Sequence, residues 1–340
     1  MASDFTTQSL DGVHLVAKVA HLYHTHGLRQ KEIGERLNIS QSKVSRLLTV
    51  AVKSGVVRTT IVTPRGLYLE IEEQLERQFG LRQAYVIGGA FADERELIFE
   101  LGAAAAAVMQ SVATSAEVIG FTSWSRSLRA MVKAMTAVPT AKATQVVELL
   151  GDVGPPALQH EASQTTEQLA AHIGAHPIFL REPGVVSNKR VRTALLELSS
   201  DSQIALRALD HLDLALVGVG TCEIIPPLRA GANFFSASQF AEAVARGAVG
   251  EINLRFIDQD GRPVHTPLDD LVIGITLDQL RASKLRRGEA GGRRKLTAVR
   301  AALVGGWINI LVTNIETAQH LLAADKGGTS MLPLPVASRG

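Results

Sequence analysis

The chain has 340 residues, and its 46% hydrophobic and 20% charged composition excludes wholesale disorder. This length exceeds one typical domain and favours two modules. The single cysteine, Cys222, rules out an internal disulfide and the clustered cysteines of a structural zinc or iron–sulfur site. Because the start has no secretion signal and no apolar run is long enough to cross a bilayer, we expect a cytoplasmic protein with no membrane partner.

Positive charge is concentrated near the start of the chain. Residues 1–63 hold eight Lys or Arg and four Asp or Glu, a local charge of +4, so the whole-chain charge of +2 leaves −2 for residues 64–340. A small basic segment beside a large near-neutral one is typical of a nucleic-acid-binding domain on a separate body. We expect a DNA-binding domain at 1–63, a connecting helix at 64–80 and a body at 81–340.

The sequence predicts an all-α winged helix-turn-helix in the first domain. Apolar residues at spacings of three and four predict a helix over 12–26 and a shorter one over 29–37. Asn38-Ile39-Ser40 then has the chemistry of a turn and an N-cap, and a third helix follows from Gln41 to Lys53. The strand-like segment 56–62 would form the wing.

In a helix-turn-helix, the start of the third helix enters the major groove of double-stranded DNA. Gln and Arg can form bidentate hydrogen bonds with adenine and guanine edges, whereas Lys18, Lys31, Lys53 and Arg58 are better placed to meet phosphates. The alternative is an ordinary three-helix packing unit with solvated charges. The agreement of turn, cap, apolar face and charge favours DNA binding. The candidate DNA-binding residues are Arg29, Gln30, Lys31, Ser40, Gln41, Ser42, Lys43, Ser45 and Arg46.

Residues 67–79 form an amphipathic connecting helix after the break at Pro64-Arg65-Gly66. Its narrow apolar face could pack on the body or associate with another subunit, and the sequence leaves both open. Dimerisation would give the DNA-binding domain two-fold symmetry.

The body alternates short β-rich runs with helical ones, and this order predicts a Rossmann-like parallel sheet with helices on both faces. The expected strands lie at 84–87, 117–121, 145–150, 177–180, 214–219 and 309–312. The expected helices lie at 94–112, 126–137, 161–173 and 294–303. Residues 251–263 predict a hairpin-like insertion with a tight turn at 260–263.

Ligands bind at the carboxyl ends of such strands, where three loops are candidates. In Thr122–Ser127, hydroxyls, backbone N–H groups and Arg126 could surround an anion. The Gly218–Thr221 loop lets a ligand approach the backbone closely, and Ala290–Lys295 adds positive charge at a helix start. Any one of these loops taken alone could equally be a tight connection.

Signatures of metal or catalytic chemistry are weak. His21, His24 and His26 form a cluster, but at most two of them share a helix face and no acidic or cysteine ligand completes the set. The sequence has no phosphate-loop run, nucleophile elbow, complete dinucleotide fingerprint or HExxH motif. Cys222 could be a nucleophile, but the absence of a predicted base favours a buried thiol. We expect no metal and no cofactor.

Three long segments carry a resemblance to a known family. GLRQKEIGERLNISQSKVSRLLTVAVKSGVV at 27–57 resembles the helix-turn-helix of the SorC-type sugar-binding bacterial regulators, often grouped with the DeoR regulators. GAVGEINLRFIDQDGRPVHTPLDDLVIGI at 247–275 and AGGRRKLTAVRAALVGGWINILVTN at 290–314 resemble its effector-domain signatures. The resemblance covers residues from about 14 to 322. It implies a body folded like ribose-5-phosphate isomerase and glucosamine-6-phosphate deaminase, a homodimer or homotetramer, and control of carbohydrate operons.

The resemblance also implies an effector site. The Thr122–Ser127 loop resembles the family's phosphate loop, Glu251 and Lys295 resemble its ligand-contacting acid and base, and Glu161 follows the LLGDVG turn. With the two loop glycines, the candidate effector-binding residues are Thr122, Ser123, Trp124, Ser125, Arg126, Ser127, Glu161, Gly218, Gly220, Glu251 and Lys295.

The sequence departs from the family pattern at two points. TSWSRS stands where many members have a glycine-rich loop such as GWGRT, and the extra hydroxyls suit an unphosphorylated polyol. Together with LLGDVGPPALQHEA, this loop is similar to regulators of sugar-alcohol operons. Asn314 stands where VTD is common, and the lost carboxylate argues against isomerase-like chemistry.

We therefore expect a transcriptional regulator controlled by a sugar, a sugar phosphate or a polyol, and not an enzyme. The rival hypothesis is a sugar-phosphate isomerase or deaminase with an appended DNA-binding domain. A third hypothesis, a purely structural DNA-binding oligomer, predicts no metabolite binding.

Overall fold

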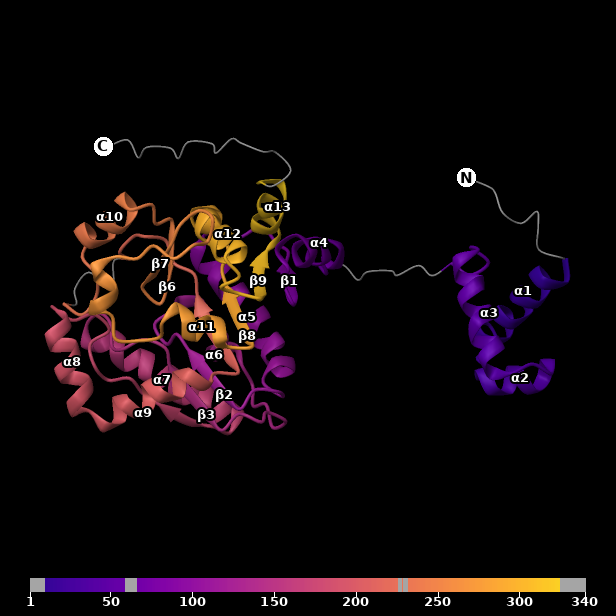
Figure 1. Cartoon of the computed structure of the whole chain (residues 1–340), viewed down its shortest axis with the longest axis horizontal. Helices are drawn as coiled ribbons and strands as arrows, with labels where there is room; N and C mark the ends of the chain where they lie inside the picture. The colour runs from indigo at the N-terminus through magenta and orange to yellow at the C-terminus, as the bar shows by residue number, and fades with distance from the viewer. Residues whose placement is uncertain (1–9, 59–65, 226–227, 229–231, 325–340) are drawn as a thin grey trace. The chain divides into compact units, whose positions relative to one another are not determined.

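The computed structural model describes residues 10–58, 66–225, 228 and 232–324. The chain divides into two compact units, a helical unit of residues 1–63 and an α/β unit of residues 64–340. In Figure 1 the helices of the first unit are indigo, and the α/β unit runs from purple through orange to yellow. Among the described residues, no helix combines the length and the apolar composition needed to cross a membrane.

Within residues 10–58, three helices form the helical unit and confirm the three that apolar spacing predicts. They are α1 (Leu10–His24), α2 (Gln30–Leu37) and α3 (Gln41–Lys53). Each contributes one fully buried side chain to a shared core, namely Val19, Ile33 and Val44. Short helices are marginal in isolation, so this common core is what stabilises them. Of the expected wing, residues 56–58 are not in a strand, and residues 59–62 lie outside the described part of the chain.

The turn between α2 and α3 is compact. Asn38 adopts a left-handed conformation with φ of 52°, and the backbone N–H of Ile39 donates to the carbonyl of Gly34 over 2.9 Å. A Cβ atom at Gly34 would lie only 2.7 Å from the carbonyl oxygen of Ile39, so the close approach requires glycine. Ser40 is the N-cap of α3, as the sequence predicts. Its Oγ accepts from the backbone N–H of Lys43 over 3.2 Å.

The connecting helix α4 (Leu69–Phe79) packs on the α/β unit, which is one of the two arrangements that the sequence left open. Leu75 is fully buried in the core of that unit. Two carboxylates of α4 also accept from the edge strand of the sheet: Glu76 from the backbone N–H of Ala84 over 2.9 Å, and Glu72 from that of Val86 over 2.8 Å. The helix therefore covers an edge whose N–H groups would otherwise lack partners.

In the described part of the α/β unit, a seven-stranded parallel sheet forms the centre and confirms the predicted α/β architecture. Its spatial order is β1-β9-β8-β5-β2-β3-β4. The strands are β1 (Gln83–Ile87), β2 (Val118–Phe121), β3 (Gln145–Glu148), β4 (His176–Ile178), β5 (Leu214–Gly218), β8 (Leu285–Glu289) and β9 (Ile310–Asn314).

Helices cover both faces of this sheet, as the sequence predicts. One face packs on α5 (Glu94–Val112), α6 (Arg126–Ala134) and α7 (Pro156–Ile173). The other packs on α4, α9 (Ser200–Ala208), α11 (Leu277–Ala282), α12 (Leu296–Val304) and α13 (Ile315–Ala324). Helices α9, α11 and α13, together with α8 (Lys189–Leu198) and α10 (Ala237–Ala245), were not predicted.

A small antiparallel hairpin, β6 (Gly250–Ile252) and β7 (Arg255–Ile257), lies beside α10 (Figure 1). The sequence predicts the hairpin and the turn near residues 260–263, but it misses the turn that joins the two strands. The two strands are joined at Asn253-Leu254, both at positive φ, and residues 258–262 form a second turn after β7. The hairpin packs through Phe256 against the rings of Phe235 and Phe240, with centroids 5.8 and 5.9 Å apart.

Candidate functional site

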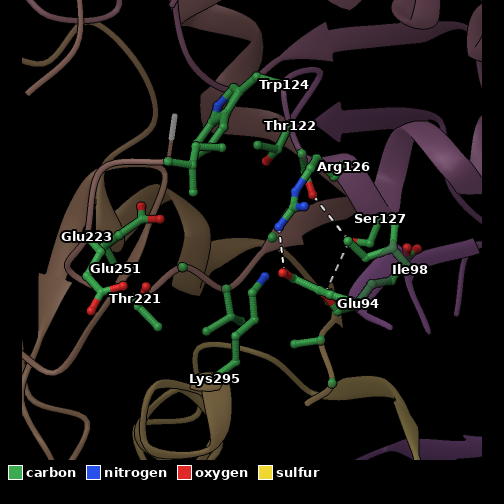
Figure 2. Close-up of a pocket in the computed structure, with 18 of the residues that line it drawn as sticks. Glu94, Ile98, Thr122, Trp124, Arg126, Ser127, Thr221, Glu223, Glu251 and Lys295 are labelled. Carbon is green, nitrogen blue, oxygen red and sulfur yellow. Dashed lines mark hydrogen bonds and ion pairs between the residues drawn. The ribbon is translucent and has the colours of Figure 1, made fainter. Parts of the chain in front are cut away.

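A cavity lies at the carboxyl ends of three neighbouring central strands, β2, β5 and β8. The first turns of α5, the loop before α12 and the hairpin β6–β7 complete its walls (Figure 2). Apolar side chains such as Leu97, Ile98, Phe234 and Phe240 make up much of the lining, with a few charged and hydroxyl groups between them. This combination is typical of a site for a small ligand.

The loop after β2 is fixed by hydrogen bonds at its start. The Thr122 hydroxyl lies 3.2 Å from the carbonyl of Leu216 and 2.9 Å from Oδ1 of Asn253, and it is buried. These contacts tie the loop to β5 and to the hairpin turn. Further along, the hydroxyls of Ser125 and Ser127 lie 3.3 Å apart at the start of α6. These hydrogen bonds therefore fix the backbone of the loop and, with it, the positions of its hydroxyl groups.

The loop after β5 is joined to the hairpin through Gly220 and Glu251. Their backbones exchange two hydrogen bonds of 3.0 Å, and a Cβ atom at position 220 would overlap the Glu251 carboxylate. Glycine is therefore needed for this carboxylate to reach the cavity. Burial raises the pKa of Glu251 to about 7, against the opposing effects of the Leu254 N–H, which donates over 2.7 Å, and the Lys295 charge.

Among the described residues, three ion pairs involve side chains of the cavity wall, and one of them is the buried pair of Arg287 and Glu289. Arg126 Nη2 lies 2.6 Å from Glu94 Oε1, and Arg294 Nη2 lies 3.0 Å from Glu223 Oε2. Arg126 and Glu94 are 42% and 50% exposed, so their pairing is screened by solvent. Figure 2 shows Arg126 and Lys295 both directed toward the middle of the cavity. The site thus has cations, but Arg126 already has an acidic partner.

The structure gathers nine of the eleven predicted effector-binding residues around this cavity: Thr122, Trp124, Ser125, Arg126, Ser127, Gly218, Gly220, Glu251 and Lys295. Ser123 is buried but does not line it. The prediction for Glu161 needs correction, because this residue lies on α7 and pairs with Arg129 and with Lys133, the latter over 3.5 Å, on the neighbouring helix α6.

Three acidic residues of the lining, Glu94, Glu223 and Glu289, were missed by the sequence analysis. Glu94 follows the N-cap of α5, where an acidic residue is common for helix stability alone. Glu289 ends β8, a strand whose polar residues gave no strand signal. One signal that could have found it is the opposite charge of Arg287, two residues earlier and therefore on the same face of a strand.

Cys222 is partly buried beside this site. Burial, together with the nearby charges of Glu251 and Glu223, raises the pKa of its thiol to about 12. The thiolate is the reactive form, so this environment argues against a nucleophilic cysteine.

The candidate DNA-binding residues lie at the start of α2 and around the turn from α2 to α3. All except Gln30, which is half-buried, are exposed. The exposed start of α3 carries Gln41, Ser42 and Lys43 in its first turn and Arg46 one turn later. These four residues are exposed and do not belong to the hydrophobic core of the helical unit.

The fold and the cavity define a ligand-sensing α/β domain that follows a basic helical unit. Comparison with known proteins identifies the class further: the Sugar-bind family model, a sugar-binding domain, matches residues 65–323. The sorbitol operon regulator of Klebsiella pneumoniae is 30% identical over 319 residues, which cover 93% of this chain and 99% of that protein. The transcriptional regulator LsrR of Klebsiella pneumoniae subsp. pneumoniae is 31% identical over 313 residues, covering 91% and 93%.

The crystal structure of the full-length sorbitol operon regulator SorC from Klebsiella pneumoniae has a TM-score of 0.69 at 29% identity, covering 94% of this chain and all of that one. The chain therefore belongs to the SorC-type family of sugar-binding transcriptional regulators. Its relatives are regulators, so the rival hypothesis of an isomerase or deaminase is not supported.

Proposed function

We propose that this regulator binds operator DNA through the start of α3 and controls a carbohydrate or polyol operon in response to an effector in the α/β cavity. In this proposal residues 1–63 bind DNA, residues 64–80 form the connecting helix, and residues 81–340 bind the effector and form the oligomer. The protein acts in the cytoplasm, where its DNA target lies.

The helical unit acts as a winged helix-turn-helix in this proposal. Gln41, Ser42, Lys43 and Arg46 read base edges, and Arg29, Gln30, Lys31, Ser40 and Ser45 contact phosphates or support the readers. The compact turn at Asn38 and the capped start of α3 support this assignment, because they present an exposed polar helix end. A homodimer or homotetramer would place two such helices on a roughly palindromic operator.

In this proposal the α/β unit acts as the sensor, and the family resemblance implies a fold like that of ribose-5-phosphate isomerase and glucosamine-6-phosphate deaminase. Its effector is a sugar, a sugar phosphate or a sugar alcohol. The single observation that carries this proposal is a mostly apolar cavity with fixed hydroxyls and carboxylates at the ends of β2, β5 and β8, in a family of sugar-binding regulators. The relative named for the sorbitol operon makes D-sorbitol and its 6-phosphate the first compounds to examine.

The test uses the full-length protein and DNA fragments selected for binding. Fluorescence anisotropy measures the affinity for the selected fragment with and without D-sorbitol, D-fructose and their 6-phosphates. We expect one compound to change DNA affinity at least tenfold, in either direction. Failure to select any DNA, or affinity that no compound changes, would contradict the proposal.

A further inference from the structure

Glu289 is a buried carboxylate of the cavity that has an unused hydrogen-bonding atom. It is the last residue of β8, opposite Gly218 at the end of β5, and the loop that follows it supplies Lys295 to the same cavity. Its side chain is completely buried. Oε1 accepts from Arg287 Nη2 over 2.7 Å. Oε2 has no partner among the described protein groups. Nearly all buried polar atoms in proteins have a partner, so an exception on a cavity wall points to a bound molecule.

The position of Arg287 explains why Oε2 is left over. Arg287 lies two residues earlier on the same face of β8 and is itself completely buried, with Nη1 donating to the carbonyl of Ala105 over 3.2 Å. The guanidinium is thus held between α5 and the sheet, and it meets only one oxygen of the carboxylate. Leu101 of α5 also lines the cavity and offers no donor.

The chemistry of this carboxylate selects the ligand group. Burial raises the pKa of Glu289 above its ordinary value, and the charge of Arg287 opposes this rise. A hydroxyl can donate to an ionised carboxylate and accept from a protonated one, so it suits Oε2 in either form. A phosphate or carboxylate placed there would set two anions together in a low-dielectric site, which is costly. An apolar group would leave Oε2 unsatisfied.

We propose that Glu289 is a specificity-determining residue that binds a hydroxyl group at an uncharged end of the effector. This inference rests on the proposed sensor function and narrows its ligand class, because any phosphate must then lie at the other end of the effector, toward Arg126 and Lys295. Trp124 Nε1, a buried indole donor of the same lining, also has no partner among the described groups and offers a second contact for a polyhydroxylated ligand.

The test measures ligand binding by isothermal titration calorimetry to the full-length protein. The probes are D-sorbitol, D-fructose, their 6-phosphates and the monodeoxy derivatives of each. In the wild-type protein, removal of the hydroxyl that Glu289 binds should weaken affinity between ten- and a hundredfold, the usual range for a hydrogen bond to a charged group. Glu289→Gln should weaken the parent compound at least tenfold and reduce the loss caused by that deoxy position.

Two further variants separate this role from a structural one. Arg287→Met with Glu289→Leu removes both buried charges together, which avoids leaving one unpaired. This double variant should bind the parent and the critical deoxy compound equally weakly. The matched control is Glu148→Gln, because Glu148 is a buried carboxylate of β3 that accepts from Thr166 and the Leu180 N–H and does not line the cavity. Its ligand affinity should stay unchanged.

The outcomes are distinct. Equal affinity of wild type, Glu289→Gln and the double variant for a compound that binds would overturn the role of Glu289 and leave the sensor function intact. If the variants fail to fold, a wild-type protein that binds a parent compound and all its monodeoxy derivatives equally well likewise overturns the role of Glu289. If no probe binds the wild-type protein, the proposed sensor of these compounds fails, and the hydroxyl contact fails with it.

Discussion

The charged side chains of the two units are arranged in opposite ways. Among residues 10–58, no Lys or Arg forms an ion pair with a described carboxylate. Around the cavity of the α/β unit, Arg126, Arg287 and Arg294 each have an acidic partner. Exposed cations without internal partners are available to a polyanion such as DNA. Cations that are already paired instead help to shape a cavity for a small ligand. Among the described residues that line the cavity, Lys295 is the cation that forms no ion pair.

The two units also differ in how much their charged side chains contribute to folding stability. The exposed cations of the helical unit contribute little to its folding, because solvent and salt screen them. The pair of Arg287 and Glu289 is completely buried, so each charge depends on the other. Substitutions in the helical unit should therefore affect DNA binding more than stability, and substitutions in β8 should affect stability first.

The largest expected effect follows removal of one buried charge. Arg287→Met leaves Glu289 without its cation and should lower the free energy of unfolding by about 3 to 5 kcal/mol. Urea denaturation followed by circular dichroism measures this loss. The matched control is Arg77→Ala, because Arg77 pairs with Glu73 on the exposed side of α4, and it should cost about 0 to 1 kcal/mol. Similar losses in both variants would refute the contrast between buried and exposed pairs.

The next effect concerns the pH dependence of stability. The pKa of Glu251 is about 7 in the folded protein and near 4.5 in an exposed chain, so the folded state binds this proton more tightly. The resulting stabilisation is complete below pH 4.5 and is lost as pH rises through 7. At about 1.4 kcal/mol per pKa unit, the loss is roughly 3 kcal/mol.

Glu251→Gln removes this titration but keeps an oxygen that can accept from Leu254. The unfolding free energy of the wild type minus that of the variant, measured in urea from pH 5 to pH 8, should therefore decrease as pH rises. A difference that stays constant would show that Glu251 titrates near its ordinary pKa.

The strands show why part of this arrangement could not be predicted. β2 has the sequence VIGF, and its apolar run predicts a buried strand directly. β8 has the sequence LRRGE, which local hydropathy assigns to the surface although it lies in the middle of the sheet. Its charges are buried because they pair with each other and with groups on α5, which are far away in the sequence. That compensation depends on tertiary packing.

The candidate site shows the same division. The loops after β2 and β5 were predicted because strand ends in a parallel sheet share one edge. Glu161 was placed there wrongly, since the sequence does not specify how α7 is rotated against α6, and the residue faces Arg129 instead. The helices of the helical unit were easier to predict, because their cap, turn and apolar spacing are all local features.

A smaller effect is expected from the helical unit. Arg46 is exposed on α3, and its Nε donates only weakly to the carbonyl of Ser42 over 3.4 Å. Arg46→Ala should weaken binding to the selected DNA by about 1 to 3 kcal/mol if the guanidinium contacts a guanine edge. Anisotropy measures this change, and calorimetry should show unchanged effector affinity. Unaltered DNA binding would remove Arg46 from the base-reading residues.

The smallest effect concerns the exposed pair of Arg126 and Glu94 at the cavity. Glu94→Gln frees the guanidinium of Arg126, so affinity for D-sorbitol 6-phosphate should rise relative to D-sorbitol by about 0.5 to 1 kcal/mol. Arg126→Ala should change the same ratio in the opposite direction. Calorimetry at low and high salt measures both, and salt should reduce the difference because these side chains are half exposed. If the ratio is the same in all three proteins, Arg126 does not contact an anionic group, and the hydroxylated end of the effector determines binding alone.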